Sequence, residues 1–373
     1  MIITKKIIKL SRHYKTPFLL FDLKQIKKNY IKLKKNIEGV EVYYAMKAND
    51  HPKILQCLAK EGGSFEISSL NELNNLLSLK INPAKIICFN PIKSPEFLDV
   101  MAKQDVQIMA YDSIDEVNKI AKFAPKSKVV LRITVSNEGS DWPLTKKFGA
   151  DAQDALHYLL YAKKKGLQPV GLTFHVGSQC LNKNNWASAL YICDDIWTEA
   201  QKRGMHLTLL SLGGGIPIQH TKPIPSVNEI GKIVNQIIHK YFKNKTNSLR
   251  LTLEPGRGLV GDAAIMVSTV IGKATRGKEE WIYIDIGVLN GLMETIANFS
   301  YELVTERNRK KRLVTIGGPS CDSIDIPFKN VAISDVKIGE RIYILNAGAY
   351  TNVYASMFNG FEIPKIYFIN SYS

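Results

Sequence analysis

The stretch Tyr43-Tyr44-Ala45-Met46-Lys47-Ala48-Asn49 decides how the chain is interpreted. Residues 40–46 are mostly apolar and predict a short buried strand that ends at a single lysine. A buried ammonium group is costly unless it is paired or neutralised. Desolvation favours the neutral amine, which is the nucleophile that forms an imine with an aldehyde. The plainer alternative is a lysine that ends a strand and reaches into solvent, and the heptapeptide alone favours that alternative.

Apolar strand-like segments and amphipathic helical segments alternate on both sides of Lys47. Strands are expected at residues 40–46, 64–67, 85–89, 107–110, 128–133, 169–174, 206–211 and 249–253. Helices are expected at residues 23–35, 52–61, 71–79, 95–103, 113–123, 150–165, 184–203 and 226–242. This alternation predicts parallel strands joined by right-handed crossovers. Polar or glycine-rich motifs follow many strands, which favours a (β/α)8 TIM barrel with one shared site over an open doubly wound sheet.

The pattern of predicted secondary structure changes at about residue 264. Strand-like runs separated by turn residues then dominate, and they predict a separate β domain of sandwich or Greek-key type. The strand expected at 17–21 precedes the barrel and can pair into that sheet. We therefore expect a barrel over residues 23–263 and a β domain built from residues 1–22 and 264–373, a division that suits a chain of 373 residues.

The formal net charge of +16 raises the question of a nucleic-acid partner. Many lysines fall on helical faces, as in residues 24–35 and 163–165, and there is no RGG tract or zinc-finger spacing, so we expect a solvated surface. No apolar run approaches the ~18 residues of a membrane span. The five cysteines include no CxxC pair, which indicates reduced thiols. We expect a cytoplasmic protein that binds neither nucleic acid nor a membrane and holds no metal.

Three further motifs follow expected strands: His175-Val176-Gly177-Ser178-Gln179, Gly213-Gly214-Gly215 and Glu254-Pro255-Gly256-Arg257-Gly258. Glycine amides and the Ser178 hydroxyl can approach a phosphate. Glu254 can bind a protonated ring nitrogen, and His175 can lie flat against an aromatic ring. Each motif has a plainer explanation: a packing histidine, a tight turn, and a loop with a Glu–Arg ion pair. Together with Lys47, however, they supply what pyridoxal 5'-phosphate needs from a protein.

Eight motifs then carry a resemblance to a known family. They are YYAMKAND, FEISSLNEL, FHVGSQ, LGGGIP, EPGRG, GGPSCDSID, NAGAYT and FNGF. In their order and spacing, and over nearly its full length, the chain resembles the fold-type III pyridoxal-phosphate decarboxylases, which include ornithine, arginine and diaminopimelate decarboxylases. The resemblance implies an alanine-racemase-like barrel, pyridoxal 5'-phosphate as cofactor, and a homodimer with shared active sites.

The resemblance also implies roles for residues around the cofactor. Lys47 would bond the cofactor aldehyde, His175 would stack on its ring, and Glu254 would keep the ring nitrogen protonated. Glu72 would tune the surroundings of Lys47. The other residues implied to contact the cofactor are Glu66, Arg132, Ser178, Gly213, Gly214, Gly215, Gly256, Arg257 and Tyr350.

The resemblance further implies that the β domain supplies substrate-binding residues across the dimer interface. Cys321 would protonate the carbon that has lost its carboxyl group, and Asp322 would bind the distal amine of the substrate. Tyr350 and Phe358 would also contact the substrate. Cys321 is therefore expected to differ from the other four cysteines, which are expected to be packing residues.

The Cys-Asp pair favours a diamine precursor, because diaminopimelate-type members usually carry Cys-Glu. We expect decarboxylation of L-ornithine to putrescine, with L-lysine to cadaverine as a further reaction. One departure leaves alternatives open: Ala297-Asn298 stands where eukaryotic ornithine decarboxylases carry Tyr-Asp, so Glu294 or Asn298 could take over, or the substrate could be diaminopimelate or a siderophore or secondary-metabolite intermediate. A non-catalytic homologue, a racemase and a nucleic-acid-binding module are weaker alternatives.

Overall fold

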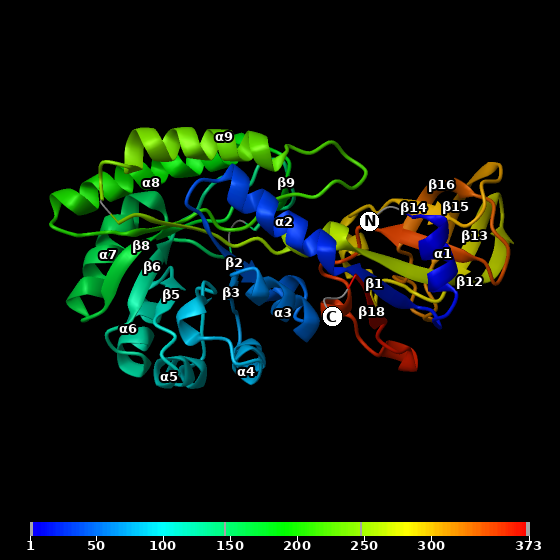
Figure 1. Cartoon of the computed structure of the whole chain (residues 1–373), viewed down its shortest axis with the longest axis horizontal. Coiled ribbons are helices and arrows are strands. Elements are labelled where there is room, and N and C mark those ends of the chain that lie inside the picture. The colour runs from blue at the N-terminus through cyan, green and yellow to red at the C-terminus, as the bar shows by residue number, and fades with distance from the viewer. Residues whose placement is uncertain (1–2, 145–146, 247, 371–373) are drawn as a thin grey trace. The chain divides into compact units, whose positions relative to one another are not determined.

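The computed structural model describes residues 3–144, 147–246 and 248–370, which form two compact units (Figure 1). The barrel unit comprises residues 27–217 and 224–256. The β unit comprises residues 1–26, 218–223 and 257–373. The short segment 218–223 thus interrupts the barrel sequence and belongs to the β unit. Each unit is described separately below.

Eight parallel strands form the barrel, in the same order in space as in the sequence. They are β2 (Glu41–Ala45), β3 (Ser64–Glu66), β4 (Ile86–Ile87), β5 (Ile108–Tyr111), β6 (Lys128–Arg132), β8 (Gln168–Thr173), β10 (Leu209–Ser211) and β11 (Arg250–Leu253). β11 pairs with β2, and Cys88, just past β4, exchanges backbone hydrogen bonds with β5: its N–H donates to Ile108 O (3.0 Å) and its C=O accepts from Ala110 (2.8 Å). The prediction of a (β/α)8 barrel is confirmed.

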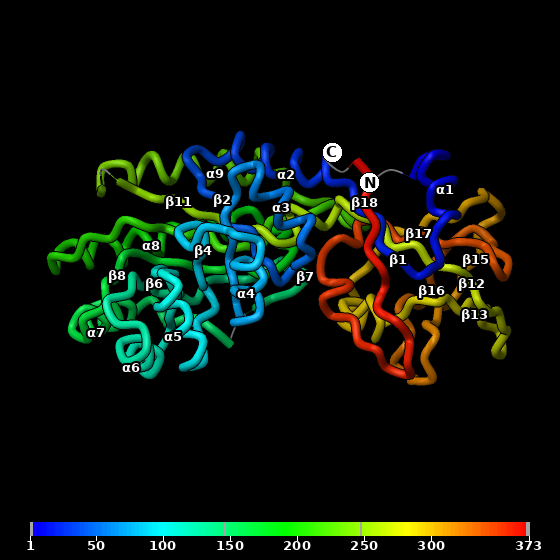
Figure 2. Tube along the Cα trace, turned by 60° about the horizontal axis from the view of Figure 1, so that its bottom comes forward, coloured from blue at the N-terminus to red at the C-terminus, as the bar shows by residue number. Residues whose placement is uncertain are grey.

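Helices surround the barrel strands in both views (Figures 1 and 2). They are α2 (Leu23–Asn36), α3 (Pro52–Lys60), α4 (Leu70–Ser78), α5 (Pro95–Lys103), α6 (Ile114–Phe123), α7 (Ala155–Lys164), α8 (Asn184–Lys202) and α9 (Val227–Ile237). Serine side chains cap the first turns of α4, α5, α6 and α9 by accepting a hydrogen bond from a backbone N–H, which fixes where these helices begin. The expected helix at 226–242 ends as α-helix at Ile237 and continues as a π-helix, Ile238–Phe242.

Shorter elements complete the barrel unit. Two are single turns of 3-10 helix, η1 (Met46–Ala48) and η3 (Ala152–Asp154). Two are short strands, β7 (Ser140–Trp142) and β9 (Ser178–Cys180). η2 (Pro83–Lys85) precedes β4. The strands expected at 85–89 and 206–211 are shorter than predicted. The regular ladder there extends only over the two residues of β4 and the three of β10.

The β unit contains one mixed sheet of eight hydrogen-bonded strands. They are β1 (Phe18–Asp22), β12 (Ala264–Arg276), β13 (Glu279–Ile284), β14 (Leu303–Thr305), β15 (Lys311–Gly317), β16 (Phe328–Ser334), β17 (Arg341–Leu345) and β18 (Lys365–Ile369). The predicted pairing of the early strand is confirmed, because β1 runs antiparallel to β12 and parallel to β18. The helix α1 (Lys5–Ser11) was not predicted; its Ile7 joins a core with Phe18, Leu20 and Tyr343. The unit also holds α10 (Arg257–Val260) and four 3-10 turns, η5 (Gly261–Ala263), η6 (Met293–Ala297), η7 (Asn352–Tyr354) and η8 (Phe358–Gly360).

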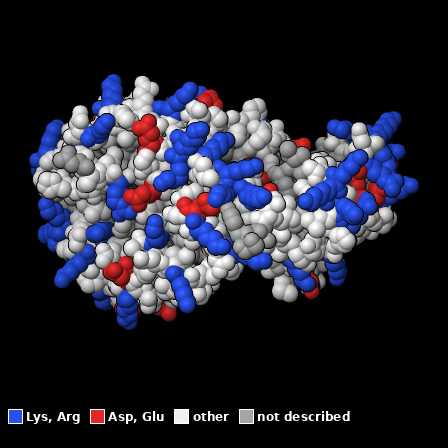
Figure 3. Space-filling model, viewed as in Figure 1, with Lys and Arg blue, Asp and Glu red and all other residues white. Residues whose placement is uncertain are grey.

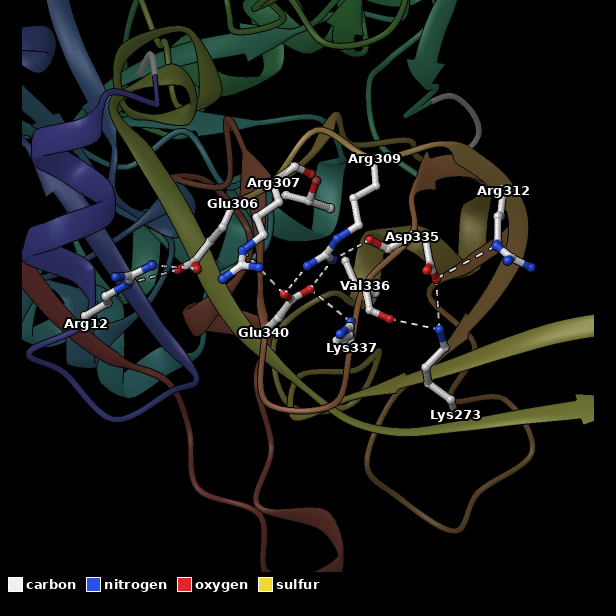
Figure 4. Close-up of polar contacts among 11 residues, drawn as sticks. Arg12, Lys273, Glu306, Arg307, Arg309, Arg312, Asp335, Val336, Lys337 and Glu340 are labelled. Atoms are coloured by element: carbon white, nitrogen blue, oxygen red, sulfur yellow. Dashed lines mark hydrogen bonds and ion pairs between the residues drawn. The ribbon is translucent and has the colours of Figure 1, made fainter.

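Ion pairs take up part of the positive charge of the β unit (Figure 4). Arg309 binds both carboxylate oxygens of Glu340 at 2.6 Å and also donates to the carbonyl of Asp335 (2.9 Å). Arg12 binds Glu306 at 2.9 Å. Over the face in Figure 3, Lys and Arg are spread among Asp and Glu rather than gathered in one patch. In the described ranges, no helix is both long enough and apolar enough to cross a bilayer.

Candidate active site

A cavity of about 240 Å³ lies in the barrel unit at the carboxyl ends of the strands. Five of the residues predicted to contact a cofactor line it: Lys47, Glu66, Arg132, His175 and Glu254. They follow or end five different strands, so only the closed barrel brings them together. The segment Phe89–Pro91, which follows β4, forms another part of the wall.

Lys47 lies in η1, directly after β2, and is held there by its neighbours. The β2 backbone is joined to the EPGRG motif by a hydrogen bond from Ala45 N to Pro255 O (3.2 Å). The Lys47 side chain is 48% exposed, because the barrel mouth leaves its amine open to the cavity. The Nζ atom lies 3.8 Å from Oε2 of Glu66, whose side chain is only 2% exposed. Within the described residues that Oε2 accepts no hydrogen bond, which leaves a buried acceptor beside the amine.

Glu254 is the second buried carboxylate of the cavity. Its backbone N–H donates to Gly213 O (2.8 Å), and its Oε1 accepts a short hydrogen bond from Ser211 and a longer one from Thr173 (3.4 Å). Burial, together with the charge of Glu66, raises the pKa of Glu254 from 4.5 to about 7. A carboxylate in this position is stabilised by any cation that enters the cavity, such as a protonated ring nitrogen.

His175 is fixed in orientation by two glycines. Its Nδ1 accepts a hydrogen bond from the N–H of Gly177 (3.0 Å), so the proton of the neutral ring belongs on Nε2. A Cβ at Gly214 would lie 2.7 Å from that Nε2, so the ring packs against a backbone that only glycine allows. Burial and the charges of Arg132 and Lys47 hold the pKa of His175 well below its usual range. The imidazole is therefore neutral at pH 7 and presents a flat face rather than a charge.

The glycine run also has a steric cause. A Cβ at Gly213 would lie 1.8 Å from Phe174 O, and one at Gly215 would lie 2.6 Å from Gly177 O. Both residues have positive φ, +62° and +104°. The Gly213 N–H donates to Ser211 Oγ (3.1 Å). A tight turn therefore accounts for these two glycines, and a phosphate contact by Gly213, Gly214, Gly215, Ser178 or Gly256 stays a prediction.

Arg257 lies in the β unit and is bound by Glu294, a residue that the sequence analysis considered as a substrate-binding carboxylate. Its Nη1 and Nη2 donate to the two carboxylate oxygens of Glu294 at 2.9 and 2.5 Å. Its guanidinium carbon lies 4.6 Å from the ring centre of Phe299 and 4.9 Å from that of Tyr350. Its Nε is buried without a hydrogen-bond partner among the described residues, and Nη1 and Nη2 each carry a second N–H, so a phosphate contact by Arg257 stays a prediction. Both Glu294 oxygens are therefore held by Arg257, and a substrate contact by Glu294 stays a prediction.

The β unit brings the GGPSCDSID and FNGF motifs together. Cys321 is exposed, and both its backbone N and its Sγ lie 3.1 Å from Oδ1 of Asn359. Phe358, next to Asn359, is 43% exposed. Asp322 accepts a hydrogen bond from the N–H of Ile324 (3.0 Å). The other four cysteines are buried, as expected for packing residues.

Two further supporting residues were missed by the sequence analysis. Ser211 ends β10 and binds Glu254; its only sequence signal is a hydroxyl at the end of an apolar strand. Asp325 is buried and accepts from Val288 N (2.7 Å) and Ser320 N (2.9 Å), which holds the loop that carries Cys321. A Cβ at Gly318 would lie 2.2 Å from the Asp325 carboxylate, so the backbone of Gly318 packs directly against the Asp325 side chain.

Similarity to known proteins covers the whole chain. A sequence model described as pyridoxal-dependent decarboxylase, pyridoxal binding domain, matches residues 23–261. Lysine/ornithine decarboxylase of Selenomonas ruminantium is 34% identical over 369 residues, 98% of this chain and 92% of that protein. The crystal structure of lysine decarboxylase from Selenomonas ruminantium has a TM-score of 0.92 at 32% identity and covers 100% and 97% of the two chains. Lysine/ornithine decarboxylase from Vibrio vulnificus, complexed with putrescine, has a TM-score of 0.92 at 25% identity and covers both chains fully.

We expect Glu254→Gln to change how the stability of the cofactor-free protein depends on pH. The pKa of Glu254 is about 7 in the folded chain and 4.5 in a solvated carboxyl group, so the folded state keeps a proton that the unfolded state releases. The resulting stabilisation is present below the lower value and is lost as the pH rises towards the upper one, by about 3 kcal/mol at most. In urea unfolding, the free energy of unfolding should fall less between about pH 5 and pH 7.5 in the variant than in the wild type.

The exposed Glu96→Gln variant is the control for this experiment, because it removes a carboxyl group without touching the cavity. Equal pH dependence in Glu254→Gln and wild type would show that Glu254 keeps an ordinary affinity for protons.

Proposed function

The chain belongs to the fold-type III pyridoxal-dependent decarboxylases, and we propose that its substrates are the basic L-amino acids ornithine and lysine. It is a carboxy-lyase that uses pyridoxal 5'-phosphate and releases the α-carboxyl group as CO2. The products would be putrescine and cadaverine. The observation that carries this proposal is the cavity itself, where Lys47, His175 and two buried carboxylates meet.

The cavity residues fit the cofactor by their chemistry. The Lys47 amine is accessible, the buried Oε2 of Glu66 lacks a hydrogen bond among the described residues, and the neutral His175 ring offers a flat face. When bound, pyridoxal phosphate supplies the electron-accepting ring that stabilises the electron pair left behind as CO2 departs. Lys47 would bond the cofactor aldehyde, and the Glu254 carboxylate would hold a proton on the ring nitrogen.

Substrate selection would rest on the β unit. Asp322 would accept from the distal ammonium group, a charge-assisted bond worth about 1.5–3 kcal/mol. That is enough to disfavour amino acids without a terminal amine. The relatives named lysine/ornithine decarboxylase support this substrate class. Glu294, which is bound to Arg257, and the exposed Asn298 are the two candidates for a second polar contact at the Ala297-Asn298 departure.

A homodimer and a cytoplasmic location complete the proposal. Cys321 is exposed on the β unit, as are the apolar side chains of Ile324, Met357 and Phe358, which suits a surface that a second copy covers. In the dimer, Cys321 and Asp322 of one chain would serve the barrel of its partner. The five cysteines are free thiols, which suits a reducing compartment.

Release of CO2 from a panel of amino acids tests the function. We expect turnover of L-ornithine and L-lysine by the purified protein supplied with pyridoxal phosphate, because a terminal ammonium group at the right distance meets Asp322. Diaminopimelate, which adds a carboxylate at that end, should be turned over more slowly by about tenfold or more. Turnover of diaminopimelate alone would replace the proposed substrate class, and the absence of turnover with every diamino acid would refute it.

Cys321→Ala tests the proposed acid. The variant should keep the visible absorbance of the bound cofactor but form the diamine about 100-fold more slowly, or give misprotonated products, because no group delivers the proton. Chromatography of the amine products against CO2 release measures both effects. Ser323→Ala, a neighbouring exposed side chain, is the control. A Cys321→Ala enzyme with full rate and a single diamine product would exclude this role.

A further inference from the structure

Lys93 is a fully buried lysine that the proposed mechanism does not use. Its side chain is 0% exposed, and its ammonium group is surrounded by acceptors. Nζ lies 2.6 Å from Ala110 O, 3.0 Å from Asn90 O and 3.2 Å from Pro91 O. It also lies 2.9 Å from Oε1 of Glu116, itself 2% exposed. The three N–H groups thus donate to three backbone carbonyls, and Glu116 Oε1, which has no hydrogen-bond partner among the described residues, completes an ion pair.

The three segments meet where the regular strand ladder of the barrel is shortest. β4 has only two residues, and its connection to β5 depends on the bridge through Cys88. Lys93 ties the loop that follows β4 to Ala110 in β5 and to Glu116 in the first turn of α6. The other carboxylate oxygen of Glu116 is bound by Lys119 at 2.6 Å, which fixes the acid in turn.

The same loop forms part of the cavity wall. Phe89, Asn90 and Pro91 line the cavity together with Lys47. Asn90 also donates through Nδ2 to Ser68 O (3.2 Å), and Ser68 is itself a lining residue. Two of the carbonyls that Lys93 holds, those of Asn90 and Pro91, therefore belong to residues that shape the cavity.

Stability alone does not require such a pair. Removing a lysine and a glutamate from water is costly, and buried ion pairs can often be replaced by apolar side chains of similar volume without loss of stability. What apolar side chains cannot do is direct three backbone carbonyls to one point. A charged hydrogen-bond donor with fixed partners specifies position where packing specifies only volume.

We propose that the Lys93–Glu116 pair is a positioning device that sets the loop of residues 89–91 for cofactor binding. The inference rests on the proposed function in that it assigns the cofactor to this cavity. Without the pair, the chain would still close its barrel, but the loop would sample several arrangements and the cavity would bind pyridoxal phosphate less tightly.

A variant with two apolar replacements separates an effect on the position of the loop from an effect on the stability of the folded chain. Lys93→Met/Glu116→Leu keeps the volume of the pair, whereas Lys93→Met alone leaves the Glu116 carboxylate buried and is expected to be less stable. Glu116→Gln is a milder variant that keeps a side-chain oxygen beside Lys93 but removes its charge, and it guards against misfolding of the others. Lys103→Met, which breaks the exposed pair with Asp99, is the matched control.

Three measurements on the full chain are needed: thermal unfolding, amide hydrogen exchange of residues 86–93 in the cofactor-free protein, and titration with pyridoxal phosphate by absorbance. In the double variant we expect a melting temperature near that of the wild type, with about tenfold faster exchange in the loop. Its dissociation constant for pyridoxal phosphate should be about tenfold higher. Glu116→Gln should also raise the exchange rate of the loop and the dissociation constant for pyridoxal phosphate. Lys103→Met should change neither.

Unchanged loop exchange or unchanged cofactor affinity in a folded double variant would overturn the positioning role. A wild-type protein that binds no pyridoxal phosphate would instead overturn the proposed function, so the two failures can be told apart.

Discussion

The structure depends on how two buried carboxylates are compensated at the mouth of one barrel. Glu66 and Glu254 end or follow separate strands, and burial, together with the charge of Glu66, raises the pKa of Glu254. Lys47, 3.8 Å from Glu66, and the hydroxyl of Ser211 on Glu254 offset part of the cost of ionisation. The negative charge that is not offset attracts a cation or a proton. A cavity that binds a protonated pyridine ring requires that attraction.

The surrounding barrel makes this arrangement possible because it converts distant sequence positions into neighbours. His175 and Gly214 lie 39 positions apart, yet the ring of one packs on the backbone of the other, and any Cβ at that glycine would meet Nε2 at 2.7 Å. The β unit follows the same logic around Cys321, where Asp325 and Asn359 fix the loop by hydrogen bonds to its backbone. In both units, glycines and buried polar side chains determine where the reactive groups lie.

Much of this could be predicted from the sequence, and the failures have physical causes. The alternation of apolar and amphipathic segments predicted the eight strands, and strand-end motifs predicted five of the side chains that line the cavity. Exposure could not be predicted: Lys47 follows an apolar strand, but the barrel mouth leaves it half open. Partners from distant segments were also invisible, since nothing in EPGRG indicates that Arg257 binds Glu294, and nothing in FNPIK indicates a buried ion pair with Glu116.

Borohydride reduction tests most directly the proposal that Lys47 carries the cofactor. Purified protein would be incubated with pyridoxal 5'-phosphate, reduced, digested and examined by peptide mass spectrometry. We predict one phosphopyridoxyl group on the peptide that contains Lys47, and its loss in Lys47→Ala but not in the exposed control Lys53→Ala. Labelling spread over many surface lysines, with Lys47 unmodified, would contradict the claim.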